Sequence, residues 1–218
     1  MSPDRKAGSP DRDLLFEYDL KLGSEFVVGA DEAGRGCLAG PIVAAGVAFD
    51  RNCLVNRGDG ELEGLFDSKR LTPTRRKALF PKIVATASRV RVVMRSAAFI
   101  DRYGIQRANI ESLTEAVAGS ADLPDATFLI DGFSLGPDAP EHRRVVKGDA
   151  TSATIAAASV IAKVIRDGCM ERASILHPDY GFDGHKGYGS EAHREAIASL
   201  GPTPIHRLSF RLTDDAGS

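Results

Sequence analysis

The sequence predicts an α/β domain in which helices flank a mixed five-stranded sheet, followed by a C-terminal helical region. Three apolar or alternating segments of strand length come first, and later strand-like segments alternate with segments of helical periodicity. The 218 residues, 43% of them hydrophobic and 27% charged, suit one globular domain with a sizeable core.

The strands follow from short apolar runs bounded by glycine, proline or charged residues. The third run alternates apolar residues with arginine, which suits a sheet with one more polar face. The fourth runs straight into an acid, Asp131. The expected strands are residues 26–30, 42–49, 89–97, 126–130 and 145–146.

The helices follow from apolar residues spaced three and four apart and from signals at the helix ends. One helix should begin with Thr72 as N-cap and Pro73 in its first turn, and Pro81 should kink or split it. An alanine-rich segment predicts a helix that packs closely on the sheet. The expected helices are residues 14–20, a segment starting at 72, 105–118, 151–170 and 190–200.

The chain is expected to hold one main domain over residues 25–212. Residues 1–24 should form a partly flexible N-terminal extension, because the first twelve contain almost nothing apolar. Residues 213–218 should form a polar tail.

Composition excludes several protein classes. The three cysteines are odd in number and scattered, which argues against a disulfide framework. No secretory signal precedes the domain, and no stretch approaches the ~18 apolar residues of a membrane span, so a cytoplasmic location is expected. A net charge of −2 argues against binding nucleic acid with the whole surface, and the basic stretch 69–77 is most simply a solvated helix start.

Two adjacent acids, Asp31 and Glu32, directly follow a buried strand and precede a glycine-flanked arginine, Arg35. Burying carboxylates costs several kcal/mol unless a cation or hydrogen-bond donors compensate. Successive strand residues point to opposite faces, so the two acids can share a site only if the strand twists or stops there. The flanking Gly34 and Gly36 favour such an interruption and let the backbone approach a ligand.

Two more acids are candidates by position. Asp131 ends the fourth strand, and strand ends at one edge of an α/β sheet are where ligand sites assemble. Asp167 lies on the alanine-rich helix four residues after Lys163, so an intrahelical ion pair is an equally good interpretation. Four converging carboxylates would need about two divalent ions, and oxygen ligands favour Mg²⁺ or Mn²⁺. Asp149 is most simply a cap or turn residue.

Two other chemistries are disfavoured. Ser134 sits in a Gly-x-Ser-x-Gly pattern after a strand, but prolines follow where a nucleophile elbow needs a helix. The five histidines lack the spacing of a zinc site. His206 and Arg207 are left open between packing and phosphate contact.

Short blocks in a fixed order together resemble the type 2 ribonuclease H family, and within it bacterial ribonuclease HII. The resemblance implies a ribonuclease H-like catalytic domain over residues 25–212. The family's metal-binding and catalytic acids fall on Asp31, Glu32, Asp131 and Asp167, which would hold two Mg²⁺ or Mn²⁺ ions, one activating the attacking water and one stabilising the leaving 3′ oxygen. The blocks are residues 31–36, 67–72, 131–132, 147–149, 156–167, 185–189 and 206–210.

The resemblance also implies which residues contact the substrate. Gly34, Arg35 and Gly36 fall on the segment whose backbone senses a ribose 2′-hydroxyl. Tyr188 falls where the family stacks an aromatic ring on the deoxyribose next to the junction. Phosphate contacts, which position the duplex, are implied for Ser68, Lys69 and Lys186.

The implied function is an endonuclease that acts on the RNA strand of RNA–DNA hybrids and cleaves 5′ of single ribonucleotides in duplex DNA. Its products would carry a 3′-hydroxyl and a 5′-phosphate. The expected partners are these duplexes and no membrane, and the chain is expected to be a monomer. One alternative is a non-catalytic hybrid-binding module with structural acids, and another is a serine esterase built on Ser134.

Overall fold

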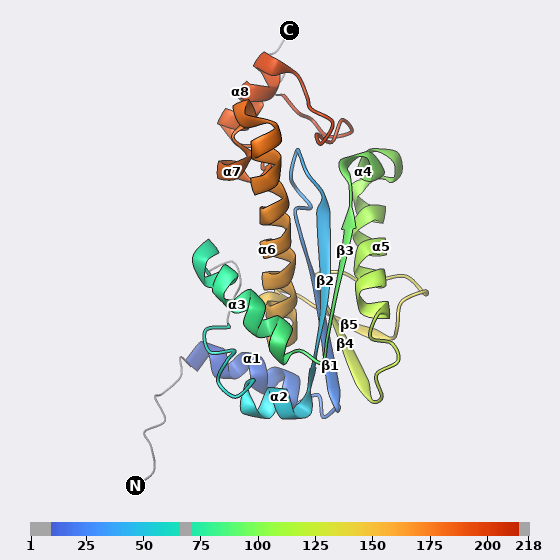
Figure 1. The fold of residues 1–218 in the computed structure, drawn as a ribbon. Coiled ribbons are helices and arrows are strands. Elements are labelled where there is room, and N and C mark those ends of the chain that lie inside the picture. Colours follow the sequence, from blue (N-terminus) through green and yellow to red (C-terminus); the bar gives the residue numbers. More distant parts are fainter. Residues whose placement is uncertain (1–9, 66–70, 214–218) are drawn as a thin grey trace.

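The structure is a computed structural model that describes residues 10–65 and 71–213. Its strands are β1 (Phe26–Ala33), β2 (Ile42–Asp50), β3 (Arg89–Arg95), β4 (Ala126–Asp131) and β5 (His142–Val145). They form one sheet in the order β3-β2-β1-β4-β5 (Figure 1). β2 runs antiparallel to β1 and β3, whereas β4 runs parallel to β1 and β5. The predicted mixed five-stranded sheet is confirmed.

Helices of very different lengths surround this sheet. The long α5 and α6 flank it, and α7 and α8 form the predicted C-terminal helical region (Figure 1). The described helices are α1 (Pro10–Leu20), α2 (Arg51–Asn56), α3 (Pro73–Thr86), α4 (Ala97–Tyr103), α5 (Ile105–Ala118), α6 (Ala153–Leu176), α7 (Phe182–His185) and α8 (Glu191–Leu200), with 3₁₀ turns η2 (Gly148–Ala150) and η3 (Pro178–Tyr180). In this described part of the chain, no helix is long and apolar enough to cross a bilayer.

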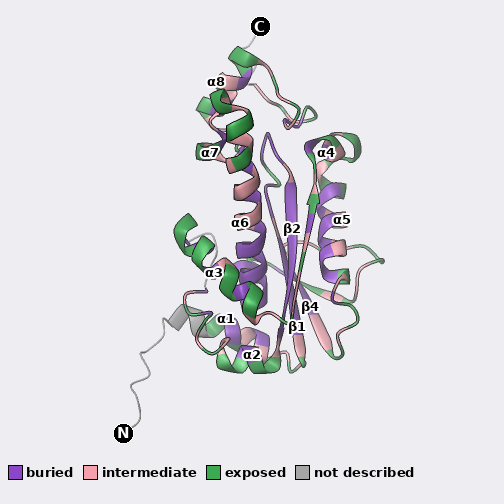
Figure 2. Ribbon diagram, viewed as in Figure 1, coloured by how far each residue is buried: buried purple, intermediate pink, exposed green. Residues whose placement is uncertain are grey.

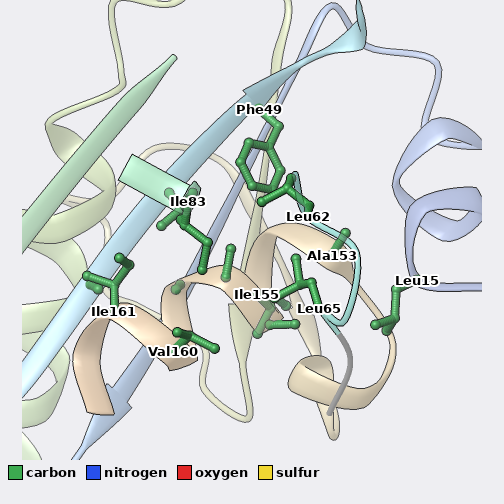
Figure 3. Close-up of a cluster of buried hydrophobic side chains, with 14 of the residues drawn as sticks. Leu15, Phe49, Leu62, Leu65, Ile83, Ala153, Ile155, Val160 and Ile161 are labelled. Carbon is green, nitrogen blue, oxygen red and sulfur yellow. The ribbon is translucent and has the colours of Figure 1, made fainter. Parts of the chain in front are cut away.

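The two long helices cover opposite faces of the sheet because alternate strand residues point to opposite sides. Val27 packs in one cluster with α6, and its neighbour Val28 packs in another with α5. Figure 2 shows burial concentrated on the central strands and on the first half of α6. Phe49 of β2, Ile83 of α3 and Ile161 of α6 belong to the cluster on the α6 face, part of which Figure 3 shows.

Close contact between α6 and β1 depends on Gly29. A Cβ atom at this position would collide with the backbone of Thr154 and Ile155 in the first turn of α6. The alanines that follow on α6 continue this close approach along the sheet. The predicted close packing of the alanine-rich helix is thereby confirmed, although the helix begins at Ala153 and continues to Leu176 instead of ending at 170.

Helix α3 confirms one prediction and corrects part of another. Thr72 caps it by accepting the amide of Arg75 at 3.3 Å, with Pro73 in the first turn, as predicted. Pro81 neither splits nor ends the helix, which continues to Thr86. Pro81 is exposed, so the carbonyl that loses its helical partner faces water, where the loss is tolerated.

Several short elements differ from the prediction. β3 ends at Arg95 rather than 97, because Ser96 accepts the amide of Phe99 and starts α4. β5 begins at His142 and ends at Val145, so it lies earlier than the predicted 145–146. It pairs with β4 alone and consists mainly of polar residues, so no apolar run marks it. The short α2 and α4 offer too few turns for a periodic pattern.

The N-terminal extension contributes to the core. α1 buries Leu15 and Phe16 against the α6 cluster, and it contains the helix predicted for residues 14–20. The predicted flexibility concerns residues 1–12, of which 1–9 lie outside the described residues, whereas α1 begins at Pro10.

Candidate active site

One cleft of about 290 Å³ lies at the C-terminal end of β1 and is lined by residues from distant parts of the sequence. Strands β1 and β4, the loop after β1, α3, α6 and the loop before α8 all contribute to it. Its lining consists of Asp31, Glu32, Ala33, Gly34, Arg35, Gly36, Arg76, Asp131, Ser159, Lys163 and Tyr188. Three of the four predicted acids, the glycine–arginine segment and the predicted tyrosine therefore share one cleft.

Asp31 and Glu32 reach this cleft without any break in the strand. β1 was expected to stop at residue 30 but continues to Ala33, still paired with β2. Its parallel ladder with β4 ends at Ala30, opposite Ile130. Past that point β1 has an open edge, and neighbouring side chains from both faces of the strand can reach the same space. The end of the ladder, rather than a turn, brings the two acids together.

Burial and mutual repulsion raise the pKa values of both acids. Asp31 is only 6% exposed, and burial, followed by the charge of Asp131, raises its pKa to about 7 despite hydrogen bonds from Ser159 and from the amide of Glu32. Burial raises the pKa of Glu32 to about 8, with further contributions from Asp31 and Asp131 that Arg35 only partly offsets. Negative charge in the cleft therefore exceeds what the protein compensates.

Asp131 is held at the end of β4 by the backbone. Its Oδ1 accepts the amide of Gly148 at 2.7 Å, which ties the strand end to η2. The next residue, Asp149, is buried in η2, and its charge also raises the pKa of Asp31. Asp149 lies in a turn, as predicted, and in addition strengthens the negative field of the cleft.

Asp167 lies beside the cleft rather than on its lining. Its Oδ1 is 2.9 Å from Lys163 Nζ, so the intrahelical ion pair considered from the sequence is present. The angle is not that of a hydrogen bond, because the same buried oxygen has no hydrogen-bond partner. The ammonium of Lys163 also lies 5.3 Å from the centre of the Tyr188 ring. Lys163, which lines the cleft, is therefore also the ion-pair partner of Asp167.

The acids suit a hard divalent cation by charge and by donor chemistry. The donors are carboxylate oxygens, which Mg²⁺ and Mn²⁺ prefer, and Glu32 Oε2 is buried without a hydrogen-bond partner. Among the described residues, no three acidic, histidine or cysteine side chains are yet grouped tightly enough to hold a metal ion. The carboxylates fit such an ion, although their side chains are not gathered around one point.

The loop of residues 34–36, called the glycine–arginine loop below, turns its backbone toward the cleft. Gly34 has a φ of +90°, and a Cβ atom there would collide with Arg166. The exposed Arg35 donates to Gln106 Oε1 at 3.0 Å and lies over the ring of Phe133. Gly36 is exposed, and apart from its chain neighbours no atom of the described residues lies within 4 Å of a Cβ position there. Bare backbone is therefore available to a ligand.

Tyr188 lines the cleft from the loop before α8. The residue is 45% exposed, its ring lies over the cations of Lys163 and Arg166, and its hydroxyl lies beside the Cys37 thiol. An exposed ring fixed from below is suited to stacking on a flat ligand group.

Of the predicted phosphate-binding residues, Lys186 is described by the structure, and it does not line this cleft. The ammonium of Lys186 lies 3.2 Å from Glu171 Oε1 and 2.7 Å from the carbonyl of Asp183. Ser68 and Lys69 lie outside the described residues.

Sequence reasoning missed the three cleft residues with polar side chains Arg76, Ser159 and Lys163. Arg76 belongs to the basic stretch interpreted as a solvated helix start, yet it is only 8% exposed. Helical periodicity could have found it, because it lies three residues before Leu79 on the buried stripe of α3. Ser159 and Lys163 are likewise four residues apart on one face of α6, which Asp167 continues.

A model of the ribonuclease HII family matches residues 28–213. The chain belongs to the ribonuclease HII family. Ribonuclease HII of Agrobacterium fabrum is 47% identical over 91% of this chain and 88% of that protein. The ribonuclease HII of Geobacter sulfurreducens is also 47% identical, over 88% of this chain and 84% of that protein.

Solved structures agree with this assignment. Ribonuclease H2 of Pyrococcus horikoshii superposes with a TM-score of 0.71 and 26% identity, over 86% of this chain and 94% of that chain. Ribonuclease HII of Archaeoglobus fulgidus, solved in a complex with PCNA, gives 0.70 and 28%, over 87% and 96%. The chain is therefore an enzyme, a type 2 ribonuclease H, with the ribonuclease H-like fold that the resemblance implied. Ser134 is followed by irregular chain, so a nucleophile elbow is absent.

Proposed function

We propose that the chain hydrolyses the RNA strand of RNA–DNA hybrids and cleaves duplex DNA 5′ of a single embedded ribonucleotide, leaving a 3′-hydroxyl and a 5′-phosphate. One observation carries the proposal. The mutually repelling carboxylates of the buried Asp31 and the half-buried Glu32 and Asp131 lie in the same cleft as the bare backbone of the glycine–arginine loop. Clustered carboxylates suit a phosphodiester reaction, and a free backbone beside them suits a sugar hydroxyl.

The four acids Asp31, Glu32, Asp131 and Asp167 would hold two Mg²⁺ or Mn²⁺ ions. When bound, these ions supply Lewis-acid activation of water and charge stabilisation at the leaving oxygen. The unpartnered oxygen of Glu32 and the raised pKa of Asp31 support the assignment, because each indicates negative charge without a counter-charge.

The chain's own residues would bind and orient the duplex. Backbone groups of the glycine–arginine loop would contact the ribose 2′-hydroxyl, which distinguishes RNA from DNA at one position. The ring of Tyr188 would stack on the adjoining deoxyribose. Arg76 and Lys163, which line the cleft, would face the phosphate between these two sugars. Ser68, Lys69 and Lys186 would contact phosphates further along, and Lys186 would have to leave Glu171 to do so.

The test is cleavage of a duplex that contains one ribonucleotide, assayed with Mg²⁺ or Mn²⁺ and then with excess EDTA. We expect one cut 5′ of the ribonucleotide with metal and none with EDTA, and a matched all-DNA duplex should stay intact. Cleavage that persists in EDTA, or that ignores removal of the 2′-hydroxyl, would refute the proposal.

Tyr188→Ala is expected to lower turnover on the single-ribonucleotide duplex about tenfold or more while changing duplex affinity less, because loss of a stacking ring removes roughly 1–3 kcal/mol of sugar positioning. Single-turnover rates and anisotropy titrations measure the two effects separately. Tyr188→Phe is the matched control, because it keeps the ring and removes only the hydroxyl beside Cys37. An unchanged rate for Tyr188→Ala would exclude the ring from the reaction.

A further inference from the structure

The segment after α8 contacts the connection between β1 and β2, which contains the glycine–arginine loop. Ala39 and His206 form an isolated antiparallel bridge, and the amide of Arg207 donates to the carbonyl of Leu38 at 2.8 Å. In Figure 1 this returning segment lies beside the connection between β1 and β2. The segment around His206 and Arg207 therefore contacts the residues that directly follow the glycine–arginine loop, although the two segments are far apart in sequence.

Arg207 makes the strongest of these attachments. Its guanidinium is fully buried and donates to backbone carbonyls only. Nη2 bonds the carbonyl of Gly34 at 2.7 Å, Nη1 bonds that of Arg35 at 2.8 Å, and Nε bonds that of Gly40 at 3.1 Å. The rigid fork of the guanidinium thus fixes two consecutive peptide groups of the glycine–arginine loop.

These bonds also determine where the amides of the loop point. In a planar trans peptide group the C=O and N–H bonds point in opposite directions. The carbonyls of Gly34 and Arg35 point to Arg207, so the N–H groups of Arg35 and Gly36 point away from it. Within the described part of the chain, neither N–H has a backbone partner. Two oriented donors therefore remain for an acceptor oxygen in the cleft.

The same segment is anchored independently of the cleft. Asp101 of α4 accepts the amides of Leu208 and Ser209 at 3.0 and 2.9 Å, and the Ser209 hydroxyl at 2.6 Å. The ring of Phe210 lies 5.2 Å from the guanidinium of Arg207. Arg207 is therefore held between α4 and the loop, and no carboxylate bonds its guanidinium among these contacts. Removing a cation from water costs free energy, and hydrogen bonds to carbonyls offset that cost only in part, so this arrangement adds little to the stability of the fold.

We infer that Arg207 is a specificity-determining positioning residue, which orients the amides of the glycine–arginine loop so that they select a ribose over a deoxyribose. The inference rests on the proposed function. Arg207 touches neither the substrate nor the reacting atoms and acts through the loop alone.

Arg194 of α8 provides a comparison outside the cleft lining. Its Nη1 donates to two consecutive backbone carbonyls, those of Arg211 and Leu212, at 3.2 and 3.0 Å. Neither carbonyl belongs to the glycine–arginine loop. A lysine at position 194 or 207 keeps the charge and loses the fork, so the two substitutions differ mainly in which backbone they release.

The experiment compares binding of two duplexes of one sequence, one with a single ribonucleotide and one all DNA. Binding is measured in Mg²⁺ on an Asp131→Asn background, where cleavage is blocked, together with the thermal melting of each variant. Arg207→Lys should reduce the preference for the ribonucleotide duplex about five- to tenfold, the effect of about one hydrogen bond, with unchanged affinity for the all-DNA duplex. Arg194→Lys should keep the preference.

An unchanged preference in Arg207→Lys, or an equal loss of affinity for both duplexes, would overturn the inference. If that variant fails to fold, Asp101→Asn answers the same question, because it loosens the anchor on α4 and leaves Arg207 intact. Asp101→Asn should reduce the preference in the same direction, and an unchanged preference would again overturn the inference. Failure of the proposed function is distinguishable, because the parent chain would then show no metal-dependent cut at the ribonucleotide.

Discussion

Replacing Asp131 by Asn is expected to reduce cleavage of a single-ribonucleotide duplex by at least about 1,000-fold, because charge stabilisation by bound ions contributes several kcal/mol and each 1.4 kcal/mol is tenfold. The amide keeps an oxygen for the bond from Gly148 N at 2.7 Å, so the strand end should stay in place. Single-turnover cleavage in Mg²⁺ and duplex binding by anisotropy measure the two properties. Affinity should change by less than about threefold, since phosphate contacts dominate it.

Cleavage by Asp131→Asn at a rate near that of the parent would exclude this carboxylate from the reaction. Ser134→Ala is the control for the exposed serine of the discounted esterase motif, and it should cleave like the parent. Loss of activity in Ser134→Ala would instead point to a role for the loop after β4.

Asp131→Asn should also stabilise the metal-free protein at alkaline pH. The pKa values of Asp31 and Glu32 are raised to about 7 and about 8, so the folded chain holds protons that the unfolded chain has lost. Stability therefore falls as pH rises from the ordinary carboxyl pKa of about 4 through 7 and 8. Asp131 raises both pKa values, so Asp131→Asn should melt above the parent at pH 8, with a smaller difference at pH 5.

Mg²⁺ should restore much of the stability that the parent loses at pH 8, because a bound cation stabilises only the folded, ionised site. A second buried acid gives the control. Asp19 does not line the cleft, and burial raises its pKa to about 6. The pH dependence of stability that Asp19 contributes should therefore not change with Mg²⁺. A melting temperature that is flat between pH 6 and 8 without metal would contradict the repulsion among the cleft acids.

The parts of the fold with local signals were predicted from sequence, and the parts set by distant pairing were not. Thr72 and Pro73 predicted the start of α3, and the apolar runs before Asp31 and Asp131 predicted β1 and β4. The true end of β1 was not predictable, because it depends on where its ladder with β4 stops. β5 was misplaced for a related reason, since it is defined by its partner strand and not by its own polar residues.

The same distinction applies to the candidate site. The residue type and strand-end position of Asp31, Glu32 and Asp131 marked them as an ionic cluster, whereas Asp167 could equally pair with Lys163 and does so. Arg207 was left between packing and phosphate contact. Its bonds run to carbonyls more than 160 residues away in sequence, and a carbonyl carries no residue-specific signal. Positioning residues of this kind become visible only in three dimensions.

Gly34→Ala is expected to lower cleavage about 100-fold or more and to destabilise the chain by roughly 1–3 kcal/mol, the usual effect of a side chain at strained positive φ. Gly34 has a φ of +90°, and the added methyl group would collide with the buried side chain of Arg166. The loop must shift to relieve the collision, which would move its amides from the cleft. Thermal melting and single-turnover cleavage measure the two effects.

Gly36→Ala is the matched substitution two residues later. Among the described residues its Cβ would meet no atom within 4 Å beyond its chain neighbours, and its φ is not in the left-handed region, so the free protein should melt like the parent. If the backbone approaches a ribose here, the methyl group meets the substrate, and cleavage should fall with no change in stability. Full activity in Gly36→Ala would mean that the sugar does not approach this residue, and unchanged melting in Gly34→Ala would mean that Arg166 yields to the loop. The pair thus separates the glycine that shapes the loop from the one that leaves room for the sugar.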